Sequence, residues 1–431
     1  MKFFINFILI LFFFSNTSAE NHLKFFIEAA FKNNLILNAE RKNQKSIKQN
    51  LNISRSEFLP SISLSGNQSS SQSSNKTNQK GNTLPDSNLD TETTSISIDQ
   101  KIFQGFKGYN SFKKSELEVK QADLKLKQTE QLTILDTVAA YFDFIFKSKN
   151  EEFNLSNVNL FERQVEFDSA RLQKGEITLT DLAQSESSLA GANAKLIKAK
   201  TELQASKTNF ERVTREKAPI NVNVSEKINI DLPDSLQKAL NTAKTNNSDL
   251  LIAKLDYQIA KKELNIEKSR LSPSASLNYS KSENKDYSAT IDELDEETVK
   301  ATISWPIIKG GENISSIKKF SLKQQRALLL AEDAENKVIT ETTNAWSKYQ
   351  SSESVLTATK SQLKAAEIAN EGITLEYDSS NTRTTLEVIQ SRSLLLDARI
   401  ASAKAERDFM ISQVELAIQL GTLSIDTIQP L

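Results

Sequence analysis

Two short segments of the chain alternate between hydrophobic and polar residues and then stop at glycine. In "SISIDQKIFQGFKG" (Ser95–Gly108), Ile96 and Ile98 would lie on one face of an extended segment and Asp99 on the other. Such a period of two predicts a β-strand, and the glycine and the helix-forming run after it predict a change to helix. The segment "ATISWPIIKGGEN" (Ala301–Asn313) repeats this order. We therefore expect strand-to-helix junctions at Gly105, Gly310 and Gly311.

The repetition extends along most of the chain. The stretch Ala30–Gly66 aligns with Ala243–Ser280, and Tyr141 aligns with Trp346. Pro60 matches Pro273 with an offset of 213, whereas Gly105 matches Gly310 with an offset of 205, so the second copy has a connection between its strands about eight residues shorter. Self-similarity of this kind indicates a tandem duplication. Each half is predicted to contain a helix, a strand, a loop, a strand, a very long helix, a turn and a long helix.

The second pair of strands has one apolar and one polar face. Val299, Ala301, Ile303 and Trp305 would point one way, and Lys300, Thr302 and Ser304 the other. The polar stretches Gly66–Asp90 and Lys281–Glu297 are expected to be solvated connections. The strands approach the roughly 9–11 residues of a tilted membrane strand. Four strands cannot close on themselves, and open sheet edges are not tolerated in lipid, so several subunits would have to contribute. A solvent-facing hairpin on a soluble protein is the alternative.

Hydrophobic residues recur every seven positions in the long helical segments. One row is flanked by a row of small residues, a pattern that allows a helix to pack against a neighbour on each side. An isolated coiled coil would satisfy the same repeat. Residues 109–174 contain neither glycine nor proline, which permits a helix of about 100 Å. Turns are expected at Gly175 and Asn381. The first row comprises Leu182, Leu189, Leu196, Leu203 and Phe210; the row beside it comprises Ser185, Ala192, Ala199, Ser206 and Val213.

The predicted organisation has five parts. Residues 1–19 combine Lys2, an apolar run and small residues at the end, the pattern of a cleaved secretory signal peptide. The first repeat covers 20–215, a linker covers 216–234 with strand-like alternation at Ile220, Val222 and Val224, the second repeat covers 235–421, and a C-terminal tail covers 422–431.

Composition narrows the possible functions. The formal net charge is −1, with 54 basic and 55 acidic residues dispersed along the chain, so nucleic-acid binding is not expected. With no cysteine and a single histidine, His22, we expect no zinc–thiolate site, no metal site, no cofactor and no thiol nucleophile, and hence no enzyme. Acidic residues cluster between the second pair of strands, but they lack the ordered spacing of a calcium loop, and a solvated loop is expected there.

Taken together, the order of these segments resembles the TolC family of outer-membrane efflux and secretion channels. The resemblance is carried by "FLPSISLSG", the glycine after each second strand, "RLQKGEITLTDL" and "AIQLGTLSIDTIQPL" (Ala417–Leu431). It implies a mainly α fold with a small β part: long antiparallel coiled-coil helices forming an α-barrel tunnel, plus four strands per protomer. Three protomers would complete a 12-stranded β-barrel in outer-membrane lipid, with the tunnel extending into the periplasm.

The resemblance also implies a constriction near the helical turns. In that family, charged and tyrosine side chains narrow the periplasmic tip. By position, Asp181 matches the first-turn acid, Arg383 the second-turn arginine and Tyr377 the tyrosine, while Glu387 and Gln390 stand where relatives often carry two aspartates. Arg383 is expected to hydrogen-bond a neighbouring acid or tyrosine. The alternative is that Asp181 and Arg383 are ordinary exposed turn charges.

The expected function is that of a passive exit duct in a tripartite efflux or type I secretion system. Its expected partners are two further copies of the chain, a periplasmic adaptor (membrane fusion) protein and an inner-membrane pump of the RND, ABC or MFS type. The alternative is a soluble periplasmic coiled-coil adaptor or scaffold. Adaptors place one helical hairpin between other domains, whereas this chain carries two equivalent hairpins and almost nothing else.

Overall fold

The computed structural model describes residues 22–219, 228–288, 290–380 and 383–430, and the chain divides into two compact units. The first comprises Met1–Asn38, Glu130–Ala243 and Glu341–Leu431, and the second comprises Ala39–Thr129 and Lys244–Thr340. The expected signal peptide, the alternation at 220–224 and the turn residue Asn381 lie outside the described residues.

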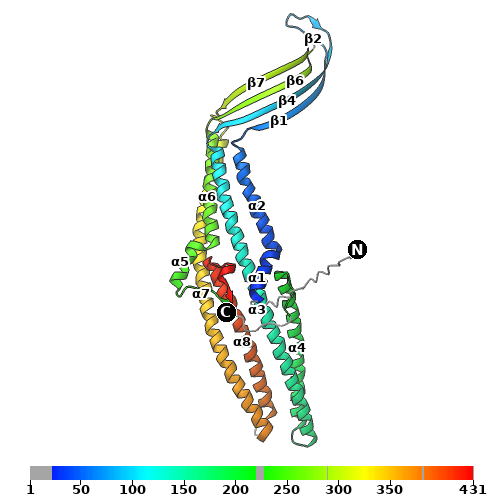
Figure 1. Cartoon of the computed structure of the whole chain (residues 1–431), viewed down its shortest axis with the longest axis vertical. Coiled ribbons are helices and arrows are strands. Elements are labelled where there is room, and N and C mark those ends of the chain that lie inside the picture. Colours follow the sequence, from blue (N-terminus) through cyan, green and yellow to red (C-terminus); the bar gives the residue numbers. More distant parts are fainter. Residues whose placement is uncertain (1–21, 220–227, 289, 381–382, 431) are drawn as a thin grey trace, which may run out of the picture. The chain divides into compact units, whose positions relative to one another are not determined.

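The second unit carries one curved antiparallel sheet of four strands (Figure 1). Its order is β1–β4–β6–β7, and every pair of neighbours is antiparallel. The bounds are β1 Ser61–Ser73, β4 Ser87–Gln104, β6 Ser274–Ser288 and β7 Ile291–Ser304. Thus the two strands of each repeat form a β-hairpin, and the pairing of β4 with β6 joins the two β-hairpins into one sheet. A small hairpin of β2 (Lys76–Thr77) and β3 (Thr83–Leu84) lies between β1 and β4 in the chain.

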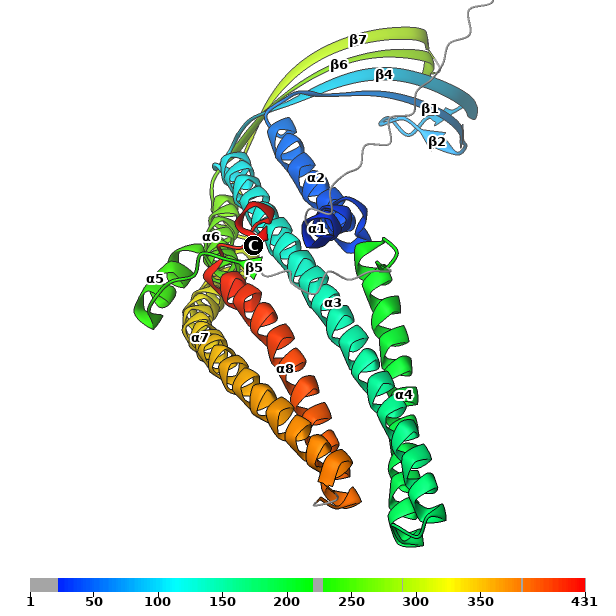
Figure 2. The same ribbon diagram turned by 60° about the horizontal axis from the view of Figure 1, so that its bottom comes forward.

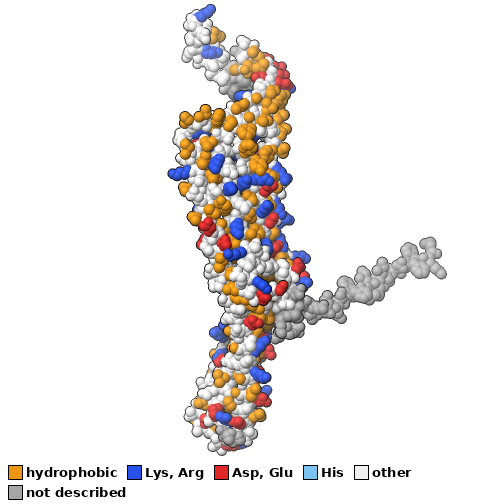
Figure 3. Space-filling model, turned by 90° about the vertical axis from the view of Figure 1, so that its left-hand side faces the viewer, with side chains coloured by type: hydrophobic (Ala, Val, Ile, Leu, Met, Phe, Trp, Pro, Cys, Tyr) orange, Lys and Arg blue, Asp and Glu red, His pale blue; other side chains and the backbone are white. Residues whose placement is uncertain are grey.

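The register gives the sheet two chemically different faces. Residues directly opposite each other in neighbouring strands share a face. One row across all four strands is apolar, and the adjacent row on the opposite face is polar, because side chains alternate along each strand. Ile303 of β7 is 79% exposed. Figure 3 shows hydrophobic side chains gathered at the surface in the upper part of the view. The apolar row is Ile62, Ile98, Tyr279 and Val299, and the polar row is Ser61, Asp99, Asn278 and Lys300.

The strands are longer than the hydrophobic pattern predicts. The stretches Gly66–Asp90 and Lys281–Glu297, expected to be loops, largely continue the strands. In the first pair only residues 74–86 separate β1 from β4, and in the second pair β6 continues to Ser288 while β7 begins at Ile291. Hydropathy detects a strand only where one face is apolar, whereas backbone pairing can continue where both faces are polar. At the other end, β7 stops at Ser304, one residue before the expected Trp305, since Pro306 follows and lacks a backbone donor.

The shorter helices are broken at an asparagine in both repeats. The pairs are α1 (His22–Asn33) with α2 (Leu35–Ser56), and α5 (Leu236–Asn246) with α6 (Ser248–Lys268), followed by the short helix η1 (Ser269–Leu271). The Asn34 Oδ1 atom accepts hydrogen bonds from the backbone of Ile36 and Leu37, at 2.9 and 3.1 Å. Asn247 Oδ1 caps α6 in the same manner, accepting from Leu250 N at 3.2 Å. An asparagine in this position satisfies backbone donors that a new helix leaves unpaired.

Four long helices form two antiparallel hairpins. The first hairpin joins α3 (Lys107–Gln173) to α4 (Leu179–Thr214), and the second joins α7 (Glu312–Ser380) to α8 (Thr385–Leu420). In the first unit, α4 lies beside the lower part of α3, and α8 beside the lower part of α7 (Figure 2). No helix in the described part of the chain has both the length and the apolar character needed to cross a bilayer.

The core of the first unit is centred on aromatic residues. Tyr141 and Phe210 are fully buried, and the ring of Phe26 packs edge-on against Phe210 with centroids 4.8 Å apart. Trp346, the counterpart of Tyr141, is also buried. Beyond α8, the chain forms η2 (Ile425–Thr427) and β8 (Gln429–Pro430), which pairs with β5 (Ile228–Asn229). This pairing ties the C-terminal tail to the segment between the repeats.

Candidate functional site

The predicted junction glycines lie between a strand and a long helix. Gly105 follows β4 and precedes α3, while Gly310 and Gly311 lie between β7 and α7. All three have positive φ angles, of 59°, 52° and 82°, which favour glycine. A Cβ atom added at Gly105 would lie 2.5 Å from Ser272 Cβ, but at Gly310 it would meet no atom within 4 Å. The first junction therefore requires glycine for space as well as for conformation.

At the first turn, Asp181 caps a helix. The chain leaves α3 through Gly175, whose φ is 73°, and α4 begins after the N-cap residue Thr178. The Asp181 carboxylate accepts from Thr178 N at 2.9 Å and from Thr178 Oγ1 at 2.7 Å, forming a capping box. The backbone hydrogen bond from Thr178, followed by the one from its side chain, lowers the pKa of Asp181. Both of these hydrogen bonds to the Asp181 carboxylate come from a residue of the same turn.

At the second turn, Glu387 occupies the corresponding position. It forms a capping box with Thr384, and the hydrogen bond from the Thr384 backbone is the main reason that the pKa of Glu387 is lowered. Arg383 donates to Glu376 at 2.6 Å and to Glu387 at 3.1 Å. The hydrogen bond to Glu376 is the main reason that the pKa of Arg383 is raised. Arg383 therefore closes the turn of its own hairpin. Gln390 lies further along α8 and is exposed.

Tyr377 lies apart from this group and is only 3% exposed. Its hydroxyl donates to Asp168 Oδ1 at 2.9 Å and is 3.1 Å from Thr385 Oγ1. Burial is the main reason that the pKa of Tyr377 is raised. The guanidinium of Arg171 lies over the tyrosine ring, 5.2 Å from its centre. Since Asp168 and Arg171 belong to α3, Tyr377 connects the second hairpin to the first.

The structure thus separates the predicted residues into three groups. Arg383 and Glu387 contact each other, Tyr377 contacts α3, and Asp181 contacts its own cap. Sequence reasoning missed Asp168, which is completely buried. The sequence pointed to Asp168 only indirectly, through Ser185, which belongs to the predicted row of small residues and donates a hydrogen bond to Asp168. A polar side chain in a buried row needs a hydrogen-bond partner.

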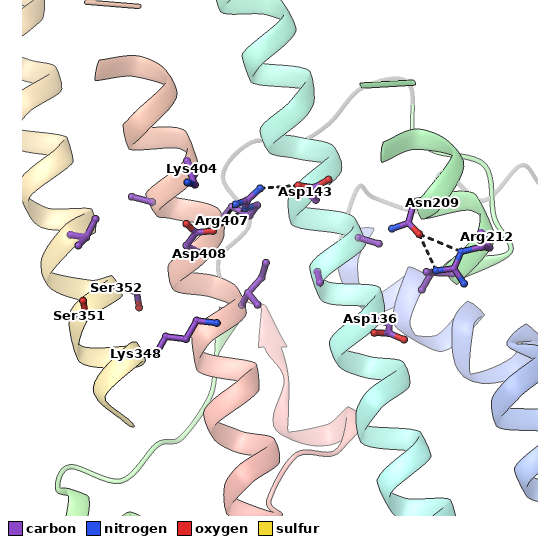
Figure 4. Close-up of a pocket in the computed structure, with 16 residues that line it drawn as sticks. Asp136, Asp143, Asn209, Arg212, Lys348, Ser351, Ser352, Lys404, Arg407 and Asp408 are labelled. Carbon is purple, nitrogen blue, oxygen red and sulfur yellow. Dashed lines mark hydrogen bonds and ion pairs between the residues drawn. The ribbon is translucent and has the colours of Figure 1, made fainter. Parts of the chain in front are cut away.

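A cavity of about 760 Å³ lies in the same unit, between the hairpins (Figure 4). Arg407 of α8 donates to Asp143 of α3 at 2.9 Å and to the neighbouring Asp408 at 2.8 Å. Asp143 also accepts from Ser206 of α4 at 3.0 Å, and Figure 4 shows Arg407 directed toward Asp143. Desolvation by the residues around it raises the pKa of Asp136, another lining residue. The ion pair of Arg407 with Asp143 is therefore a further connection between the two helical hairpins.

Comparison with known proteins places this arrangement in a class of export channels. The family model described as outer membrane efflux protein matches residues 26–214 and 239–422. The outer membrane efflux protein BepC of Brucella suis is 27% identical over 92% of this chain and 84% of its own length. The outer membrane protein TolC of Escherichia coli is 22% identical over 95% of this chain and 84% of its own length.

Solved structures share the fold. The chain resembles CusC with a TM-score of 0.78 and 16% identity, over 94% of this chain and 92% of CusC. It resembles the Campylobacter jejuni CmeC outer membrane channel with a TM-score of 0.82 and 15% identity, over 93% of this chain and 85% of CmeC.

The chain belongs to the outer membrane efflux protein family. It is a channel protein of the outer membrane, with the mainly helical fold and small strand part that the sequence predicts. The prediction of a TolC-like efflux or secretion channel is confirmed.

Proposed function

We propose that three copies of this chain form one continuous exit duct. The observation that carries this proposal is the four-stranded sheet, whose order begins at β1 and ends at β7 and therefore leaves both of these edges available. In lipid, unpaired backbone groups at a sheet edge cost several kcal/mol each. Pairing β7 of one copy with β1 of the next would close twelve strands into a ring, with the row containing Val299 toward lipid and the row containing Lys300 toward water.

The duct is passive in this proposal and carries out no chemistry. An inner-membrane pump supplies the energy, and a periplasmic adaptor connects that pump to the turns of the two hairpins. The named relatives are consistent with this division of labour, because they include efflux proteins and a protein named for alkaline protease secretion. Selectivity for cargo would then reside in the pump, and the same duct would serve either efflux or type I secretion.

We further propose that the turns form a closed tip when the pump is absent. Arg383 and Glu387 lie at the second turn and Asp181 at the first, so three copies would bring six charged turns around the axis. The ion pairs of Arg383 with Glu376 and Glu387 would order the second turn in the narrow state. Tyr377 would restrain the second helical hairpin against α3 through its hydrogen bond to Asp168.

Fractionation and assembly test the duct against the alternative of a soluble adaptor. The full-length protein should remain in the outer-membrane pellet after a carbonate wash and should run as a trimer after mild detergent extraction. Planar bilayers should then show a low closed-state current. A protein that washes off the membrane, or that stays monomeric in detergent, would refute the duct and favour the adaptor.

A further inference from the structure

A further cavity lies at the strand-to-helix junctions, within the unit that carries the sheet. Its volume is about 440 Å³, and its lining comes from the end of β4, the start of α3, the start of β6 and the segment between β7 and α7. Both repeats therefore contribute to it. Of the described residues that line this junction cavity, none is an acid and four are cations: Lys101, Lys107, Arg270 and Lys309.

Only one of the four cations has an acidic partner in the described part of the chain. Arg270 pairs with Glu267 at 3.0 Å and with Glu312 at 3.4 Å, so neighbouring carboxylates balance its charge. The three lysines form no ion pair with any described residue. Like charges that face one cavity repel each other, and an anion between them would turn this repulsion into attraction. The charge around the cavity thus favours an anionic ligand.

A buried amide gives independent support for a ligand. Asn313, in the first turn of α7, lines the cavity and is only 7% exposed, and its side chain has no hydrogen-bond partner among the described residues. Buried polar groups are nearly always hydrogen-bonded, so a group inside the cavity is expected to bind this amide. With the offset of 205, the counterpart of Asn313 is Gly108, where an added Cβ would lie 3.3 Å from the Phe58 ring. The repeated fold itself therefore does not require the amide.

The strand register places the cavity on the polar face of the sheet. Lys101 follows Asp99 by two residues in β4 and lies opposite Ser276, which precedes Asn278 by two in β6. Asp99 and Asn278 belong to the polar row, and residues two apart in a strand share a face. In the proposed duct this face is turned toward water. A dissolved ligand is therefore favoured over a lipid headgroup.

We propose that the junction cavity binds a dissolved oxyanion, of the class of inorganic phosphate, on the water-filled side of the duct. The position inside the duct rests on the proposed function, whereas the binding site lies within one chain. Each lysine provides three donors and a positive charge, and the Asn313 amide and the Ser272 hydroxyl provide further donors. Several separate donors match the several oxygens of phosphate better than they match chloride. Three copies would place nine of these lysines around the axis.

Titration with inorganic phosphate tests the site. Full-length trimers in neutral detergent at low ionic strength should show saturable binding of one phosphate per chain by isothermal titration calorimetry. A variant that combines Lys101→Gln, Lys107→Gln and Lys309→Gln removes the unpaired charges and keeps most of the side-chain length. This triple variant should bind phosphate about tenfold or more weakly, because hydrogen bonds to charged groups are lost. Unchanged affinity of the triple variant, or no saturable binding by the unmodified protein, would overturn the proposal.

Two single substitutions sharpen this test. Asn313→Asp has nearly the same volume and places a carboxylate among the lysines, where it would take the place of the anion. It should abolish phosphate binding and keep the yield and the melting temperature of the trimer at least as high as before. Lys300→Gln is the matched control, because it removes one positive charge from the polar face outside the cavity, and it should keep phosphate binding. Equal losses in Lys300→Gln and the triple variant would mean that only the general charge of the face matters, which contradicts a defined site.

Current measurements separate this inference from the duct itself. In planar bilayers, phosphate added to dilute chloride should reduce the current of the unmodified channel and leave that of the triple variant unchanged. Protein that binds phosphate in detergent but forms no channel would refute the duct and support the site. Channels that form while the protein binds no phosphate would overturn the site alone. Loss of phosphate binding in nanodiscs of phosphatidylglycerol would place the cavity against lipid headgroups and overturn its assignment to the water-filled side.

Discussion

Arg171 and Tyr377 occupy corresponding positions in the two repeats and contact each other. Each lies seven residues before the N-cap of the next helix, Thr178 and Thr384 respectively, and the guanidinium lies 5.2 Å from the ring centre. The duplication has therefore placed a cation in one copy against an aromatic face in the other, a favourable pairing. Two identical residues at this contact would lack that complementarity. Divergence between the repeats makes their association within one chain specific.

Removal of the Ser185 hydroxyl should destabilise the first hairpin. Ser185→Ala leaves a buried carboxylate with one donor fewer, which costs about 1.5–3 kcal/mol. Thermal unfolding in detergent, followed by circular dichroism, should show a lower midpoint. Ser188→Ala is the matched control, because this hydroxyl on the same helix bonds only to the Gln184 backbone at the surface. An equal effect of both substitutions would contradict a special role for Ser185.

The junction glycines should differ in their tolerance of alanine. Gly310→Ala meets only the backbone cost of a positive φ, about 1–2 kcal/mol. Gly105→Ala meets that cost and also a collision with Ser272 and with the backbone oxygen of Ser269, at 2.5 and 2.7 Å. We expect a clearly lower yield of folded trimer for Gly105→Ala than for Gly310→Ala. Equal yields would show that the first junction can widen.

Adjacent residues of β7 should respond in opposite ways to a change of charge. Val299→Lys places a cation in the apolar row, which costs about 2–4 kcal/mol if that row faces the middle of a bilayer. Lys300→Glu changes a charge in the polar row, so trimers should form and the preference of the channel for cations should increase. Reversal potentials in a salt gradient measure this preference. Normal assembly of Val299→Lys would contradict the proposed orientation of the sheet.

The capping acids should make the helix starts sensitive to acid. The pKa of Asp181 is lowered from 3.8 in the folded protein. The ionised carboxylate therefore stabilises the start of α4 fully above about pH 3.8, and this stabilisation is lost as the pH falls through the lowered pKa. Hydrogen exchange of the first turn of α4, corrected for intrinsic rates, should increase in that range. Asp181→Asn should abolish this increase at α4 and leave the corresponding increase at α8, where Glu387 is the acid of the capping box.

Loss of Arg383 should affect closure more than folding. Arg383→Ser removes the cation between Glu376 and Glu387, and repulsion between these carboxylates should then disorder the turn. The closed-state current should rise while the melting temperature of the trimer stays unchanged. Arg399→Ser is the matched control, because Arg399 pairs with Glu367 in the same hairpin but away from the turn. An unchanged current in Arg383→Ser would contradict a role in closure.

Much of the architecture could be predicted because it depends on local periodicity. The alternation in β4 and β7, the seven-residue rows of α4 and the breaks at Gly105 and Gly175 each act over a few residues. The length of α3 followed from the absence of glycine and proline. The ends of β1 and β6 could not be predicted in this way, because the polar parts of these strands have no apolar face to mark them. Only the hydrogen-bond ladder defines how far these strands extend.

The sequence by itself determined two repeats, two-faced strands, long amphipathic helices and membership of a channel family. Only the tertiary structure decided which polar residues meet. Asp168 stands in a helix rich in charged residues, where one more acid resembles a solvated side chain, and its partner Tyr377 is 209 residues away. Periodicity reports which face of a helix is buried, but it carries no information about which distant helix covers that face. The identity of a buried hydrogen-bond partner therefore becomes visible only after the hairpins have packed.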